Sequence, residues 1–224
     1  MLVQIYSLTS VRDVEVCEAA GVDHIGVAAG DQAVPASIST ERARELFDRW
    51  PDGPDRRTSA LSVHTHPDEI VDYARAVDPD VLHVCSETDA VDVAETRAIR
   101  DRIGDINLMK AIDVEGPAAV EAARDFAPVS DWLLLDTATP DVEGVGASGA
   151  IHDWSVSREI VETVDVPVVL AGGLGPENVA EAVRTVRPAG VDSYTHTSES
   201  ERRKDPAKVR AFVENAREAA AAVR

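Results

Sequence analysis

The stretch PVVLAGGLGPENVAEAVRTVRPAGVDS, residues Pro167–Ser193, decides the fold of this chain. It begins with a short β-branched apolar run, turns at a glycine pair, continues as an amphipathic segment and ends in a second apolar run. That order is typical of a strand, a helix and a further strand parallel to the first. We predict strands at Val168–Ala171 and Val191–Tyr194, and Pro176 stands where the first turn of a helix tolerates proline.

The same alternation of strand and helix extends in both directions along the chain. The eight predicted strands are Leu2–Tyr6, His24–Val27, Ala60–His64, Val81–Cys85, Asn107–Ile112, Trp132–Asp136, Val168–Ala171 and Val191–Tyr194. A helix candidate follows each strand, and no linker or low-complexity tract divides the 224 residues. The sequence therefore predicts one α/β domain over residues 1–224, a single (β/α)8 TIM barrel, with a doubly wound open sheet as the alternative.

Several predicted helices carry recognisable start signals. Ser10 can cap the first helix with Asp13 three residues later, and Ser39 can cap the second. Pro67 fits a first turn, and Asp205-Pro206 opens the last helix.

Composition excludes two classes of partner. The net charge is −19, which makes nucleic acid an improbable ligand because phosphate backbones attract basic surfaces. No apolar run approaches the roughly 18 residues that a membrane span needs. Lysine occurs only at Lys110, Lys204 and Lys208, and acidic residues spread along the helices, which indicates a surface adapted to high salt.

The N-terminus and the cysteines bear on the compartment. MLVQIYSLTS has no basic region followed by an apolar stretch, so we predict no signal peptide and a cytoplasmic location. Cys17 and Cys85 fall in different predicted elements and suggest neither a disulfide framework nor a zinc ribbon.

Four stretches carry a resemblance to a known family: Val3–Val27, Trp132–Trp154, Pro167–Ser193 and Lys204–Arg217. In order and spacing they resemble the phosphoribosylanthranilate isomerases of tryptophan biosynthesis over nearly the whole chain. The resemblance implies an Amadori rearrangement of an aminoaldose phosphate to an aminoketose phosphate, without a cofactor. It also implies that Asp136, at the end of the sixth strand, is the general acid, which suits a partly desolvated carboxyl with a raised pKa.

The expected base of that family is missing. The family's first strand ends in Cys-Gly, and these positions are Tyr6 and Ser7 here. A phenol with a pKa of about 10 is a poor base near neutrality. We therefore name Tyr6 and His83 as candidate catalytic partners of Asp136, with His66 and His196 as further candidates, because histidine titrates near neutrality.

The predicted phosphate site keeps some of the family's features and loses others. Glycine turns present backbone N–H groups that favour anions. The predicted ligand-binding residues are Lys110, Gly146, Ser148, Gly149, Gly172, Gly173, Thr195 and His196, and we expect Lys110 to point into the barrel. His196 replaces a glycine of the family, and Val34-Pro35-Ala36 replaces a Ser-Pro-Arg whose arginine helps to hold the anthranilate carboxylate.

A histidine cluster leaves a metal site open as an alternative. His64 and His66 would share one face of the third strand, and His83 and Cys85 one face of the fourth. Such residues could bind a divalent metal, as in pentulose-phosphate epimerases, although outward-facing or hydrogen-bonded histidines are the simpler interpretation and we assign no metal.

Three functions follow from these patterns. The first is a sugar-phosphate isomerase with altered substrate or mechanism, acting on a phosphorylated small molecule as a monomer or homodimer. The second is an authentic phosphoribosylanthranilate isomerase that uses another base. The third is a metal-dependent epimerase or a non-catalytic barrel that binds a phosphorylated metabolite.

Overall fold

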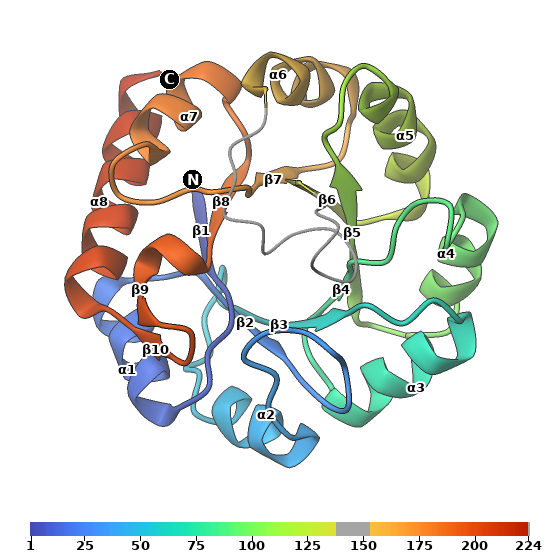
Figure 1. Ribbon diagram of the computed structural model, residues 1–224, viewed down its shortest axis with the longest axis horizontal. Coiled ribbons are helices and arrows are strands. Elements are labelled where there is room, and N and C mark those ends of the chain that lie inside the picture. The colour runs from blue at the N-terminus through green and yellow to red at the C-terminus, as the bar shows by residue number, and fades with distance from the viewer. Residues whose placement is uncertain (138–152, 224) are drawn as a thin grey trace.

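Eight parallel strands close into a barrel in the computed structural model, which describes residues 1–137 and 153–223 (Figure 1). The strands are β1 Leu2–Ile5, β2 His24–Ala28, β3 Arg57–Ser62, β4 Val81–Val84, β5 Asn107–Asp113, β6 Trp132–Asp136, β7 Val168–Leu170 and β8 Gly190–Ser193. Each strand pairs with its neighbours in sequence, and β1 pairs with β8, so Ile5 lies opposite Ser193. This closure confirms the predicted (β/α)8 barrel over the open sheet.

The helices form a ring outside the barrel (Figure 1). They are α1 Val11–Ala20, α2 Thr40–Phe47, α3 Pro67–Val77, α4 Val93–Arg100, α5 Ala118–Phe126, α6 Trp154–Thr163, α7 Val179–Val186 and α8 Pro206–Ala222. The sequence did not predict the short helices η1 (Ala127–Val129) and η2 (Thr195–Thr197), nor the antiparallel pair β9 (Ser198–Ser200) and β10 (Arg203–Lys204). The last three of these elements lie between β8 and α8, at the end of the barrel that carries the candidate site.

Alternation along the strands divides the apolar side chains into an outward set and an inward set. One set, with Val3 and Ile5 of β1, packs outward against the helices in the main cluster. The other set fills the barrel interior near the N-terminal ends of the strands, with Met109, Leu134 and Val169 at its centre. Towards the C-terminal ends the interior holds a small apolar cluster of Val63, Cys85 and Ala111, together with the ionisable groups Asp136 and Asp192.

Most of the predicted helix starts are confirmed. Ser10 and Asp13 form a reciprocal capping box, and the Ser39 side chain accepts from the Arg42 N–H. Pro67 begins α3, and Asp205 caps α8 through two backbone N–H groups. Pro176 is a correction, because it lies in the turn before α7 while Asn178 occupies the N-cap position.

The third strand begins and ends earlier than predicted. It covers Arg57–Ser62 in place of Ala60–His64, because Thr58 is held at its start by Asp80. The Asp80 carboxylate accepts from the Thr58 N–H at 2.7 Å and from the Thr58 hydroxyl at 2.9 Å. His64 therefore lies in the loop after β3 and is not on its face.

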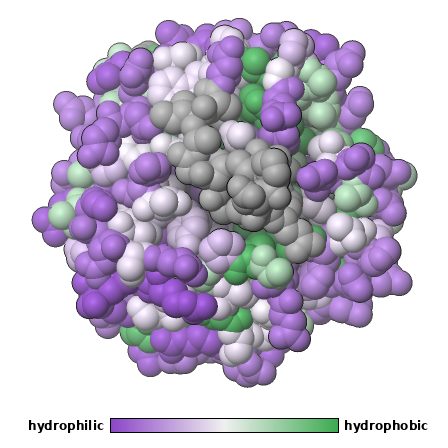
Figure 2. Space-filling model, in the orientation of Figure 1, coloured by the Kyte–Doolittle hydropathy of each residue, from purple (hydrophilic) through white to green (hydrophobic). Residues whose placement is uncertain are grey.

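The surface agrees with the composition. Hydrophilic residues cover most of the face seen in Figure 2, with apolar residues in small separate patches. In residues 1–137 and 153–223, no helix has the length and apolar character that crossing a membrane requires. Cys17 and Cys85 are both buried and unpaired.

Candidate active site

A small cleft of about 30 Å³ opens at the C-terminal ends of β6, β7 and β8. Barrel enzymes place their chemistry at this end of the strands. The residues that line the cleft are Asp136, Gly172, Gly173, Leu174, Asp192, Ser193, Tyr194, Thr195 and His196. The structure therefore brings together five residues predicted from the sequence: Asp136, Gly172, Gly173, Thr195 and His196.

Asp136 has the properties of an acid that works near neutrality. It ends β6 on the inward face, in register with Asp113 of β5. Burial raises the pKa of Asp136 to about 7, and the Asp113 carboxylate adds to the rise, while the hydrogen bond from the Thr137 N–H opposes it. That N–H lies 2.7 Å from Asp136 Oδ1. A carboxyl with such a pKa can hold and donate a proton at neutral pH.

The loop after β7 is a tight turn shaped by its glycines. Gly172 and Gly173 have φ values of 79° and 62°, a left-handed backbone that favours glycine. Asn178 closes the turn by accepting from the Gly175 N–H at 2.8 Å and donating to the Gly173 carbonyl at 3.0 Å. A Cβ at Gly175 would lie 2.6 Å from His196 Cβ, so this loop meets the loop after β8 at close range.

The loop after β8 is anchored by a buried lysine that sequence reasoning missed. Lys204 is 1% exposed, and its Nζ donates to the Tyr194 carbonyl at 3.2 Å and to Ser198 Oγ at 3.0 Å. The ammonium also lies 4.8 Å from the centre of the Tyr194 ring. Burial lowers the pKa of Lys204 to about 8, and nearby anionic groups oppose the shift. These contacts fix the backbone immediately before η2.

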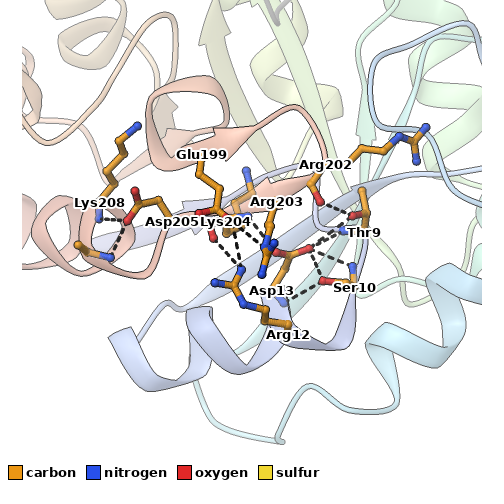
Figure 3. A network of polar contacts seen from close by, with 11 residues as sticks. Thr9, Ser10, Arg12, Asp13, Glu199, Arg202, Arg203, Lys204, Asp205 and Lys208 are labelled. Carbon is orange, nitrogen blue, oxygen red and sulfur yellow. Dashed lines mark hydrogen bonds and ion pairs between the residues drawn. The ribbon is translucent and has the colours of Figure 1, made fainter.

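Figure 3 shows how this anchor reaches the first helix. The Lys204 N–H donates to Asp13 Oδ1 at 2.9 Å, while Asp13 Oδ2 accepts from the Ser10 N–H and hydroxyl. The Thr9 hydroxyl donates to the Arg202 carbonyl at 2.8 Å. The loop after β1 and the β9–β10 hairpin are therefore parts of one polar network beside the cleft.

Tyr6 fills the barrel interior and is a poor candidate base. Its hydroxyl lies 2.7 Å from Ser59 Oγ, and its ring makes an edge contact with His83 at 5.4 Å between centroids. Burial raises the pKa of Tyr6 well above 10, so the phenol stays neutral. Ser7 follows with a φ of 61°, a left-handed conformation that is unusual for serine. The geometry favours packing over proton transfer at Tyr6.

His83 is also poorly suited to accept a proton. Its Nε2 lies 3.2 Å from Cys85 Sγ, and both side chains are buried. Burial lowers the pKa of His83 to about 3, and the Lys110 ammonium adds to the effect. Burial raises the pKa of the Cys85 thiol, so a thiolate is disfavoured there. The catalytic role of His83 stays a prediction that this environment does not support.

Lys110 points away from the barrel interior, which corrects its expected inward orientation. It shares the outward face with Val84 and Leu133, its neighbours across β4 and β6. Its Nζ donates to the Ser86 carbonyl and lies 5.4 Å from the Phe126 ring. A role for Lys110 in ligand binding stays a prediction that no contact with the cleft supports.

Among the described residues, the histidines do not assemble into a metal site. His64 and His66 follow the end of β3, and His64 faces Glu69 at 3.8 Å while His66 precedes α3. His83 and Cys85 contact each other inside the barrel. Within residues 1–137 and 153–223, no three His, Cys, Asp or Glu side chains lie where they could hold one ion.

Three predicted ligand-binding residues, Gly146, Ser148 and Gly149, lie outside the described residues.

Asp192 is the functional candidate that the sequence analysis overlooked. It lies on β8 opposite Gln4, faces the interior and lines the cleft with Asp136. Its signal in the sequence was a carboxylate near the end of a predicted barrel strand, on the opposite face from Val191.

The fold and the cleft define the class of protein first. This is a closed (β/α)8 barrel with two inward carboxyls beside a glycine turn, at the end of the barrel where such enzymes bind small ligands.

Comparison with known proteins then defines the family. The family profile described as N-(5'phosphoribosyl)anthranilate (PRA) isomerase matches residues 8–215. The N-(5'-phosphoribosyl)anthranilate isomerase of Haloferax volcanii is 42% identical over 223 residues, which are 99% of this chain and 95% of the relative. The chain belongs to the PRA isomerase family, and its curated relatives include proteins of halophiles, in keeping with its acidic surface.

Solved structures agree with this membership. Phosphoribosyl anthranilate isomerase from Thermotoga maritima superposes with a TM-score of 0.81 at 28% identity, over 97% of this chain and 99% of that chain. A phosphoribosyl anthranilate isomerase in complex with reduced 1-(o-carboxyphenylamino)-1-deoxyribulose 5-phosphate gives 0.79 at 26% identity, over 97% and 100%.

Proposed function

We propose that this chain converts N-(5'-phosphoribosyl)anthranilate to the corresponding aminoketose phosphate, using a base other than cysteine. The observation that carries the proposal is Asp136, an inward carboxyl with a pKa of about 7 at the end of β6, where the family has its acid. The cleft beside it has a glycine turn on one side and η2 on the other, which suits a phosphate.

The comparisons support the family's own reaction over a sugar-phosphate isomerase with altered substrate. Relatives that carry the isomerase name align with this chain from end to end. Tyr6 in place of the thiol does not argue against the reaction, because the interior holds other ionisable groups. We further infer a single domain, a cytoplasmic location, a phosphorylated small-molecule ligand, and a monomeric or homodimeric state.

The test is the loss of phosphoribosylanthranilate fluorescence with purified protein in molar potassium chloride. We expect turnover by the wild-type chain and a loss of about 10²–10⁴-fold in kcat for Asp136→Asn, the usual contribution of a positioned acid or base. Asp125→Asn makes the same chemical change on the exposed face of α5 and should leave turnover unchanged.

Absence of turnover by wild-type protein that unfolds cooperatively in the same buffer would contradict the proposed function. Turnover that survives Asp136→Asn would instead remove Asp136 from the mechanism. Tyr6→Cys places a thiol at the position of the family's base. The ratio of its kcat to that of the wild-type chain measures how effective the thiol is relative to the base that this chain uses.

A further inference from the structure

We propose that Asp192 is the general base that removes the C2 proton of the substrate, working as one unit with Asp136 across the cleft. This inference rests on the proposed isomerase function and supplies the base that the sequence lacks. The groups expected to replace the thiol, Tyr6 and His83, are both held neutral inside the barrel, where neither can take up a proton readily.

The geometry places both carboxyls in the same cleft. Asp136 ends β6 and Asp192 lies near the end of β8, with only β7 between the two strands. Both side chains are on the inward face, because Asp136 shares the face of Leu134 and Asp192 is in register with Gln4. Both also line the cleft that the glycine turn and η2 border. A ligand in this cleft would contact the two carboxyls together.

Asp192 has an unused acceptor. The residue is 8% exposed, and its Oδ1 is buried without a hydrogen-bond partner among the described residues. A buried carboxylate oxygen without a donor is unfavourable, and a catalytic role is one of the reasons for which a protein keeps such an atom. That oxygen keeps a lone pair that no donor among the described residues occupies.

The electrostatic surroundings raise the pKa of both carboxyls. Burial raises the pKa of Asp192 to about 7, and the Asp136 carboxylate adds to the rise, while the Gln4 amide and the Lys204 ammonium lower it. Tyr6, Cys85 and Tyr194 have raised pKa values and stay neutral, Asp113 lies beside Asp136, and His196 lies at the cleft itself. Two close carboxyls that titrate near neutrality provide one acid and one base at the same pH.

The two groups balance the rearrangement without an oxidant or reductant. Asp136 gives its proton to the ring oxygen as the C1–O bond breaks, leaving an iminium between C1 and nitrogen. Asp192 takes the C2 proton, the C2–H electron pair becomes the C1=C2 bond, and the iminium electrons return to nitrogen. Return of a proton from Asp192 to C1, and transfer of the O2 proton to Asp136, then give the aminoketose and restore both groups.

The experiment compares wild type, Asp192→Asn and Asp125→Asn in molar potassium chloride. It measures kcat and KM by fluorescence loss, the isotope effect with substrate deuterated at C2, and the Kd of reduced 1-(o-carboxyphenylamino)-1-deoxyribulose 5-phosphate. For Asp192→Asn we expect kcat to fall about 10²–10⁴-fold and the Kd to change less than about threefold. The acidic limb of the pH profile, which reports ionisation of the base, should disappear, and Asp125→Asn should match wild type.

The outcomes separate this inference from the proposed function. Wild-type turnover that survives Asp192→Asn with its acidic limb intact overturns the role of Asp192 and leaves the isomerase function standing. An equal loss of kcat/KM and of analogue binding, with kcat unchanged, makes Asp192 a binding residue and also overturns its role as base. No turnover by the folded wild-type protein removes the proposed function, and the role of Asp192 with it.

Discussion

Replacing Gly26 by alanine tests how tightly Tyr6 fills the barrel, because the Tyr6 ring, directly after β1, lies against Gly26 of β2. A Cβ built at Gly26 would lie 2.6 Å from Tyr6 Cε2 and Cζ, and 2.7 Å from Cδ2. Real Cβ contacts do not reach these distances, so the ring would have to move. The ring has little room, because its hydroxyl contacts Ser59 at 2.7 Å and its edge contacts His83.

We expect Gly26→Ala to lower the free energy of unfolding by about 1–3 kcal/mol, the usual cost of overpacking a core. In a Tyr6→Cys background all three contacting ring atoms are absent. Alanine should then be neutral or stabilising by about 0.5 kcal/mol, because glycine inside a strand is less favourable than alanine. The double-mutant cycle should thus give a coupling energy of about 1–3 kcal/mol.

Chemical denaturation of the four proteins in molar potassium chloride, followed by tryptophan fluorescence, provides the measurement. Tyr6→Cys will itself lower stability, since it removes a buried ring, but the cycle subtracts that effect. Equal costs of Gly26→Ala in the two backgrounds would refute the reasoning, because they would mean that the Tyr6 ring does not limit the space at Gly26.

Three further predictions use the same denaturation assay. Ser7→Gly should raise the free energy of unfolding by about 0.5–1 kcal/mol, because a φ of 61° strains any residue with a Cβ; a loss would mean that the serine hydroxyl matters more. Lys204→Met should lower it by about 1–3 kcal/mol, because the Tyr194 carbonyl loses a charged donor, and an unchanged value would contradict the anchoring role. Burial raises the pKa of Asp192 from 3.8 to about 7, so the folded state holds this proton more tightly than the unfolded state does. The resulting stabilisation is complete below pH 3.8 and is lost as the pH rises through about 7. The stability of Asp192→Asn relative to wild type should therefore grow by about 2–3 kcal/mol between pH 5 and pH 8, whereas a constant difference would show that Asp192 is already ionised at pH 5.

The barrel was predictable because its signals are local and repeated. Short β-branched runs alternate with amphipathic segments, and Ser10, Ser39 and Asp205 mark helix starts with side chains that reach only a few residues along the chain. The start of β3 was not predictable in this way. Asp80 holds Thr58 from 22 residues away, and hydropathy does not report such a contact.

The candidate site was predictable only in part. Asp136, Gly172 and Gly173 stand at strand ends, where the fold alone marks them for inspection. The orientation of Lys110 was mispredicted, because an ionisable residue in a barrel strand can point to either side. Its outward position depends on the Ser86 carbonyl and the Phe126 ring, which come from other elements.

The sequence by itself determined the fold class, the family, the acidic surface and the position of Asp136 at a strand end, because each of these depends on residue order and local periodicity. Only the tertiary structure decided which groups can exchange protons. Closure of the barrel buries Tyr6 and His83 so that both stay neutral, and it brings Asp192 of β8 into the cleft of Asp136. Burial and the proximity of charges set a pKa, and both depend on residues far apart in the sequence.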